Sequence, residues 1–168
     1  MNIFSKLGLL FLIGITACKD ISKEKPDAGE SLQTTIDKVK LISLNGQPVD
    51  MKQYKGKTIF INFWATWCKP CLEEMPSIKK AKEIMKNENI EFLFASNETA
   101  GEIEVFNKEH DYGFNFVKAG NMEELNIMGL PTTLIFNPDG KLVFPEMGYR
   151  KWDDTTNIDL ILKIGKQK

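Results

Sequence analysis

The sequence predicts an α/β fold, in which one domain over residues 35–168 forms a central mixed β-sheet with helices on both faces. Two observations lead to this prediction. The apolar runs 58–64 and 90–95 have the composition of buried strands, and the stretch between them carries apolar residues at helical spacing. Two strands joined by a helix form a parallel crossover unit. Residues 132–144 have instead the pattern of an antiparallel hairpin, so the sheet is expected to be mixed.

The domain is expected to open with a β-hairpin. Residues 39–44 alternate between apolar and polar side chains, and Asn45-Gly46 follows them directly. An Asn-Gly pair after an alternating segment is a strong hairpin signal, because both residues tolerate the positive φ angles of a tight turn.

The later elements follow from local patterns. The first helix extends to about residue 86, and its inner face carries Leu72, Met75, Ile78, Ala81 and Met85. A weaker pattern predicts a helix over 102–109 and a short strand over 114–117. In the hairpin, strands 132–136 and 141–144 flank the turn Asn137-Pro138-Asp139-Gly140, and a C-terminal helix begins at about residue 153.

The segment Trp67-Cys68-Lys69-Pro70-Cys71 lies at the junction between the strand 58–64 and the first helix. A cysteine at a helix N-terminus has a stabilised thiolate, and a second cysteine three residues later can close a disulfide with it. This spacing predicts Cys68 as a nucleophile and Cys71 as the resolving thiol of a redox couple that needs no cofactor.

A zinc knuckle and an inert disulfide are the alternatives to a redox couple. Structural zinc takes four ligands, and beyond this pair the chain offers only His110 and Cys18. We therefore expect no metal site. A disulfide that closes so short a loop adds little stability by entropy, which also disfavours an inert role.

The N-terminus has the pattern of an exported protein. A short apolar core within residues 1–17 predicts a secretory signal peptide, because it is too short to span a membrane. Ile15-Thr16-Ala17-Cys18 resembles the lipobox of bacterial lipoproteins, which implies lipidation at Cys18 and a lipid anchor in the cell envelope, facing the periplasm or the exterior. Residues 18–34 are polar and are expected to form a flexible tether. An uncleaved anchor with a free Cys18 is the alternative, and the net charge of −1 gives no indication of nucleic-acid binding.

Three segments together resemble the TlpA/ResA group of thioredoxin-fold proteins. They are the active-site segment 62–71 followed by Glu74 and Pro76, the loop Gly129-Leu130-Pro131-Thr132, and the turn 137–140. The resemblance implies a thioredoxin-like sandwich in which Pro131 is cis and packs against the two cysteines. It also implies that Leu130 offers backbone hydrogen bonds to an extended substrate peptide.

One departure from thioredoxin concerns Asn62, which stands where thioredoxins carry a buried aspartate that relays protons. The TlpA/ResA group has a glutamate three residues after the second cysteine, here Glu74. We hypothesise that Glu74 is partly desolvated, has a raised pKa and assists deprotonation of Cys71; the alternative is a surface glutamate near a helix N-terminus. The expected substrate-binding residues are Trp67, Lys69, Pro70, Leu130 and Pro131, with Trp67 and Trp64 packed around the site. Lys69 either stabilises the Cys68 thiolate or is an exposed lysine of modest effect.

The resemblance implies an extracytoplasmic thiol-disulfide oxidoreductase. It favours reduction of protein disulfides, including the heme-site cysteines of apocytochrome c, with a membrane electron donor of thioredoxin-reducing type. A disulfide oxidase or isomerase that uses the same couple is the nearest alternative. A metal-handling module and a redox-silent binding module on the same fold are further alternatives, and the peroxiredoxin pattern is absent from the sequence.

Overall fold

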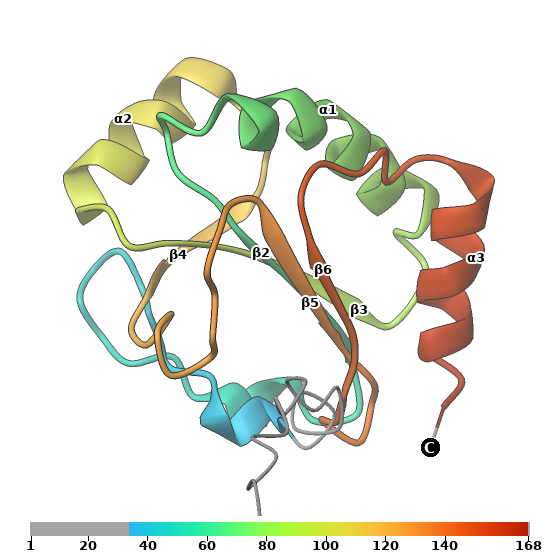
Figure 1. The fold of residues 1–168 in the computed structure, drawn as a ribbon. Coiled ribbons are helices and arrows are strands. Elements are labelled where there is room, and N and C mark those ends of the chain that lie inside the picture. Colours follow the sequence, from blue (N-terminus) through green and yellow to red (C-terminus); the bar gives the residue numbers. More distant parts are fainter. Residues whose placement is uncertain (1–33, 168) are drawn as a thin grey trace, which may run out of the picture.

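The computed structural model describes residues 34–167, which form one six-stranded sheet in the order β1-β4-β3-β2-β5-β6 (Figure 1). Three α-helices and two short 3-10 helices, η2 and η3, pack against this sheet. The strands are β1 Leu41–Ile42, β2 Thr58–Phe63, β3 Ile90–Ser96, β4 Asn115–Ala119, β5 Thr132–Phe136 and β6 Leu142–Met147. The helices are η2 Ile36–Lys38, η3 Met51–Tyr54, α1 Lys69–Ile84, α2 Ala100–His110 and α3 Thr155–Ile164.

The central strands are paired as the sequence predicts. β2 runs parallel to β3 and antiparallel to β5, and β3 runs parallel to β4. All six residues of β2 are buried, because both faces of this strand are covered. The carboxyl ends of β2 and β3 therefore meet at one edge of the sheet, and the chain enters α1 from that edge.

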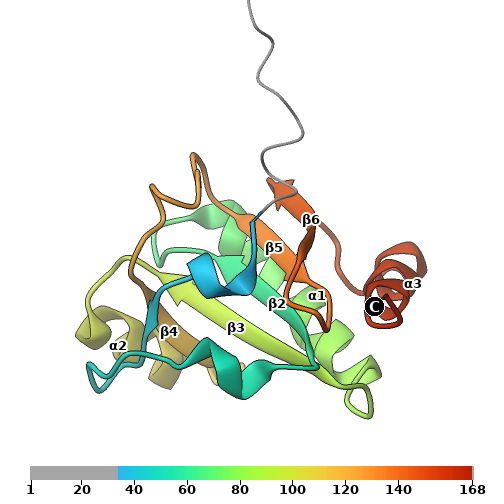
Figure 2. The ribbon, with the colours of Figure 1, turned by 90° about the horizontal axis from the view of Figure 1, so that it is seen from below.

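The three α-helices lie on the same face of the sheet (Figure 1). Side chains alternate along β2, so that Phe60 packs with these helices whereas Ile59 and Ile61 pack on the opposite face. That opposite face is covered by η2, η3 and the segment between β4 and β5, and Figure 2 shows the 3-10 helices in blue and teal over the sheet. Helices thus lie on both faces, but within residues 34–167 one face has only 3-10 helices. The crossovers from β2 to β3 and from β3 to β4 run in one direction, which places α1 and α2 on one side.

The predicted opening hairpin over 39–44 forms only in part. β1 pairs with β4, and the chain that follows the Asn45-Gly46 turn returns to Ile42 through a single bridge at Pro48. Gly46 has the positive φ that the turn requires, at 87°. The second arm ends after Val49, whose N–H donates to the carbonyl of Leu41 at 2.9 Å, because Asp50 then accepts from the backbone N–H of Lys52 and begins η3.

The remaining helices and the last hairpin agree with the sequence patterns. α2 begins earlier than residue 102 because Thr99 and Glu102 form a capping box, in which each side chain accepts from the other's backbone N–H. β5 and β6 form the predicted hairpin, and β6 tolerates Pro145 because it is an edge strand. α3 buries Ile158 and Ile161.

The predicted signal peptide (1–17), Cys18 and the tether up to residue 33 lie outside the described residues. Among residues 34–167, the helices are too short or too polar to span a membrane.

Candidate active site

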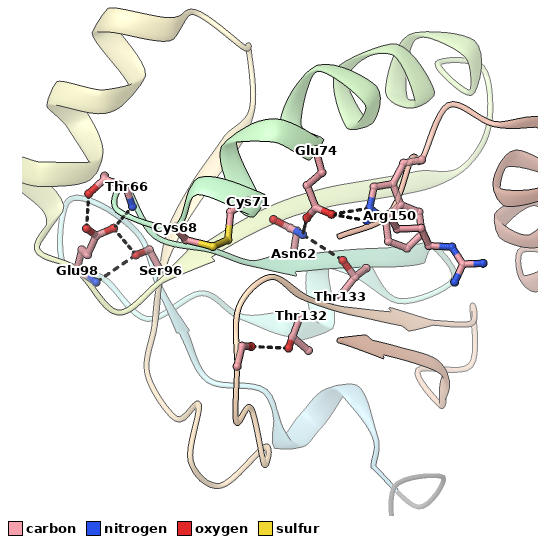
Figure 3. Close-up of a disulfide and its surroundings, with 12 residues drawn as sticks. Asn62, Thr66, Cys68, Cys71, Glu74, Ser96, Glu98, Thr132, Thr133 and Arg150 are labelled. Carbon is pink, nitrogen blue, oxygen red and sulfur yellow. Dashed lines mark hydrogen bonds between the residues drawn. A yellow bond between two sulfur atoms is a disulfide. The ribbon is translucent and has the colours of Figure 1, made fainter. Parts of the chain in front are cut away.

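The two cysteines of the Cys68-Lys69-Pro70-Cys71 segment form a disulfide at the start of α1 (Figure 3). Their sulfur atoms are 2.02 Å apart and their Cα atoms 5.3 Å apart. Cys68 is the N-cap of α1, and Pro70 lies in the first turn, where its missing N–H leaves no hydrogen bond unmade. The local sequence therefore places the disulfide at the positive end of the helix dipole, as expected.

The two cysteines differ in exposure. Cys68 is 4% exposed and Cys71 is fully buried at 0%. Since a substrate disulfide reaches the more exposed sulfur first, this geometry fits the predicted roles, with Cys68 as the nucleophile and Cys71 as the resolving thiol.

Glu74 lies one helical turn after Cys71 and is completely buried. Its Oε1 accepts a hydrogen bond from Nδ2 of Asn62 at 2.7 Å. Its Oε2 accepts from the backbone N–H of Arg150 at 3.1 Å and from Nε1–H of Trp152 at 3.4 Å. Burial raises the pKa of Glu74 from 4.5 to about 7, although these three hydrogen bonds to the carboxylate oppose the rise. The structure therefore buries Glu74 as the hypothesis expects and contradicts the alternative of a surface glutamate, whereas its assistance to Cys71 stays a prediction.

Asn62 connects Glu74 to the sheet. Its Nδ2 also donates to Oγ1 of Thr133 on β5 at 3.0 Å, and Asn62 and Thr133 face each other in the β2–β5 register. Figure 3 shows the Asn62 amide between the Glu74 carboxylate and the disulfide. Sequence reasoning noted the substitution of asparagine for the thioredoxin aspartate, but it did not predict contacts with Thr133, Arg150 or Trp152.

A second carboxylate holds the loop before Cys68. Oε2 of Glu98 accepts from the backbone N–H of Thr66 at 2.8 Å, and Oε1 accepts from the hydroxyl of Thr66 at 2.5 Å. The hydroxyl of Ser96 donates to Glu98 at 2.9 Å. The sequence analysis missed Glu98. Its position just after β3 was the available signal, because polar residues after neighbouring parallel strands meet at one edge of the sheet.

The loop before β5 reaches the same edge of the sheet. The Leu130–Pro131 peptide bond is cis, as the family resemblance implies. Thr132 pairs with Phe63, the last residue of β2, so Pro131 lies level with the start of the loop that leads to Cys68. The loop is held by a hydrogen bond from Thr132 Oγ1 to the carbonyl of Gly129 at 2.7 Å.

The two tryptophans near the disulfide lie in opposite environments. Trp64 is buried and packs against Phe106 and Phe116, with ring centroids 4.7 and 5.1 Å away. Trp67 is 73% exposed, so the expectation that it packs around the site is wrong and its ring is free to contact a partner. Lys69 is exposed, and its Nζ lies 3.8 Å from Oε1 of Glu73. Its position agrees with the alternative of an exposed lysine of modest effect.

A groove of about 470 Å³ lies beside the active-site loop. Thr66 and Leu72 line the side nearest the disulfide, and Val105 and Phe106 of α2 line the opposite side. No cluster of three or more potential metal-ligating side chains occurs within residues 34–167. The site thus combines the buried carboxylate of Glu74 with the Cys68–Cys71 disulfide, beside a largely apolar groove.

Comparison with known proteins identifies close relatives. The Redoxin family profile matches residues 27–162. The chain is 35% identical to the thiol-disulfide oxidoreductase ResA of Bacillus subtilis (strain 168) over 104 residues, which cover 59% of this chain and 58% of that protein. It is 31% identical over 140 residues to ResA of Geobacillus kaustophilus, covering 81% of this chain and 79% of that protein.

Solved structures share the fold. The thioredoxin domain of a thiol-disulfide oxidoreductase from Bacteroides vulgatus superposes with a TM-score of 0.64 at 21% identity, covering 77% of this chain and 94% of that one. StoA from Bacillus subtilis superposes with a TM-score of 0.60 at 18% identity, covering 79% of this chain and all of that one. This similarity supports the predicted thioredoxin-like sandwich.

Proposed function

This chain belongs to the Redoxin family and is a ResA-like thiol-disulfide oxidoreductase, and from this premise we propose that it reduces disulfide bonds in protein substrates outside the cytoplasmic membrane. The observation that carries the mechanism is the complete burial of Glu74 one turn after the resolving cysteine. A carboxylate with a pKa near 7 can accept a proton from a thiol at neutral pH.

The proposed cycle begins with the reduced protein. The Cys68 thiolate attacks one sulfur of the substrate disulfide, and the other substrate sulfur leaves as a thiolate that takes a proton from water. Glu74 then accepts the proton of Cys71, whose thiolate attacks the Cys68 sulfur of the mixed disulfide. The Cys68–Cys71 disulfide forms, the second substrate sulfur leaves as a thiolate that takes a proton from water, and two electrons have passed to the substrate.

The surroundings of the disulfide suit a protein substrate. Trp67, Met128 and Met147 are large apolar side chains that are at least two-thirds exposed. Met147 pairs with Thr132 and its sulfur lies close to Gly129, so it borders the cis-proline loop. Exposed apolar residues next to a reactive disulfide are typical of a binding surface for a partner chain. We propose that an extended peptide binds along Leu130 and Pro131, and that the heme-site cysteines of apocytochrome c are candidate substrates.

The proposed location follows from the N-terminus. A lipid on Cys18 would anchor the domain in the cell envelope through the tether, facing the periplasm or the exterior. Because that compartment is oxidising, continued reduction of substrates requires a membrane electron donor that returns the Cys68–Cys71 pair to the dithiol form.

The reduction potential of the Cys68/Cys71 couple tests the direction of electron flow. The purified full chain is equilibrated with glutathione and dithiothreitol buffers, and the dithiol fraction is measured by thiol alkylation, with Cys68→Ser and Cys71→Ser as controls. A potential of about −270 mV, like that of thioredoxin, supports a reductase. A potential of about −120 mV, like that of the oxidant DsbA, would instead favour the alternative of a disulfide oxidase.

Glu74→Gln tests the proposed base. We expect slower resolution of a mixed disulfide at Cys68, and loss of the pH dependence of that step near pH 7, in a protein that remains folded. A resolution rate equal to that of the unmodified protein at every pH would remove Glu74 from the mechanism.

A further inference from the structure

The side-chain oxygen of Asn62 is buried without a hydrogen-bond partner among the residues that the structure describes. Asn62 is 0% exposed, and its Nδ2 group donates both to Glu74 and to Thr133. In Figure 3 its Oδ1 points away from Glu74, to the side of the amide where the disulfide lies. An unpaired buried acceptor is unfavourable, which points to a donor that is present in another state of the protein.

Reduction of the disulfide supplies such a donor. Cys71 is fully buried and carries no hydrogen while it is bonded to Cys68, but the reduced residue has an S–H group. We propose that Asn62 is a positioning residue for the resolving cysteine: its amide oxygen accepts from the Cys71 thiol while Glu74 is ionised, and its amide rotates to donate to the Cys71 thiolate once Glu74 is protonated. This inference rests on the proposed role of Glu74 as the base.

The hydrogen bonds of Glu74 determine which of its oxygens takes the proton. Oε2 accepts from the backbone N–H of Arg150 and from Nε1–H of Trp152, and neither group can act as an acceptor. Oε2 therefore stays an acceptor, and the proton resides on Oε1. Oε1–H would then face the N–H of Asn62, donor against donor. A half-turn of the Asn62 amide removes this conflict by exchanging Oδ1 and Nδ2.

Thr133 is compatible with both amide orientations. Its hydroxyl oxygen accepts from Asn62 Nδ2 in the present orientation, and its O–H can donate to Oδ1 after the rotation. In the rotated state Oδ1 accepts from Glu74 and Thr133, and Nδ2 is turned to the side of Cys71. An N–H donor stabilises the thiolate, so the rotation assists the attack of Cys71 on the mixed disulfide.

The step conserves protons and electrons. The proton leaves Sγ of Cys71 and ends on Oε1 of Glu74; the Cys71–Cys68 bond forms as the bond from Cys68 to the substrate sulfur breaks. Asn62 carries neither the proton nor the electron pair. Its amide changes only which group it presents to Cys71.

The charged side chains of Arg150, Asp153 and Glu98 near the site are paired with groups other than Glu74. The guanidinium of Arg150 binds Glu146 at 3.0 Å and Asn157 at 2.7 Å, and Asp153 pairs with Lys80 at 2.9 Å. Glu98 binds Thr66 on the opposite side of the disulfide (Figure 3). Glu74 is therefore the titratable group that sets the orientation of the Asn62 amide.

Reaction of the reduced full chain, carrying Cys18→Ser so that Cys68 and Cys71 are its remaining thiols, with Ellman's reagent separates the two chemical steps. Attack by Cys68 releases a first thionitrobenzoate and leaves the second as a mixed disulfide, which Cys71 then displaces. We compare Asn62→Leu, of similar volume but without polar atoms, with Thr58→Val, which removes a buried hydroxyl that has no partner in the described part of the chain. Asn62→Leu should slow the second release about tenfold or more and leave the first unchanged, whereas Thr58→Val should change neither rate.

Two further measurements keep the proposal testable if Asn62→Leu does not fold. Thr133→Val should slow the second release about two- to fivefold, because it removes the hydroxyl that supports both orientations. In NMR spectra of the oxidised full chain, coupling across the hydrogen bond between Asn62 Nδ2 and the Glu74 carboxylate should be present at about pH 9 and lost at about pH 5.

The outcomes separate this inference from the proposed function. A second release that is normal in both Asn62→Leu and Thr133→Val but slow in Glu74→Gln would overturn the role of Asn62 and leave the base in place. A normal second release in Glu74→Gln would remove both. Persistence of the Asn62–Glu74 coupling at pH 5 would also overturn the rotation.

Discussion

Ionisation of Glu74 should make the oxidised protein less stable as the pH rises. The carboxyl group has a pKa near 4.5 in an unfolded chain and about 7 in the folded protein, so the folded state binds the proton more tightly. The contribution of protonated Glu74 to the free energy of unfolding is fully present below about pH 4.5 and is lost as the pH rises to about 7. At 1.36 kcal/mol for each pH unit, the loss is about 3 kcal/mol.

Glu74→Gln removes this titration. Glutamine keeps an acceptor for the N–H groups of Arg150 and Trp152 and presents an amide to Asn62, but it has no charge to desolvate. The free energy of unfolding, measured by urea denaturation of the oxidised full chain between about pH 4.5 and 8, should fall by about 3 kcal/mol more in the unmodified protein than in the variant. The oxidised form is used because Cys68 and Cys71 do not titrate while they are joined in the disulfide.

Surface carboxylates do not disturb the comparison. Hydrogen bonds lower the pKa values of Glu102, Glu124 and Asp153, and these contributions are the same in both proteins. Parallel plots of stability against pH for the two proteins would refute the reasoning, because they would mean that Glu74 is not destabilised as a carboxylate in the folded state.

Substitutions at three residues test other parts of the site. Glu98→Ala should lower the free energy of unfolding by about 1–3 kcal/mol in urea denaturation, because it leaves the N–H of Thr66 unpaired, and Glu98→Gln should restore part of the loss. Trp67→Ala should change the stability by less than about 0.5 kcal/mol and raise KM for a protein disulfide, since the ring is 73% exposed; an unchanged KM would exclude a substrate contact. Val105→Asp should raise KM for a protein disulfide severalfold and leave glutathione disulfide reduction unchanged, because the residue lines the groove; equal effects on both substrates would argue against groove binding.

Much of the site was predictable because it is local in sequence. The apolar run of β2, the cysteine spacing and the helix that follows place Cys68, Cys71 and Glu74 along one side of the first turns of α1. The cis bond at Pro131 followed from the family resemblance. The hairpin after β1 forms only in part because the Asn45-Gly46 signal predicts the turn but not the length of the second arm, which ends where Asp50 begins η3.

The sequence alone determined the strands, the helices and the reactive pair of this protein, because each depends on residues within a few turns or strand positions of one another. Only the tertiary structure decided that Glu74 is a buried acid. Its hydrogen-bond partners come from β2 and from the segment after β6, at Asn62, Arg150 and Trp152. The energy of a carboxylate depends on the water that such distant segments exclude and on the donors that they supply, and neither is encoded in the residues beside it.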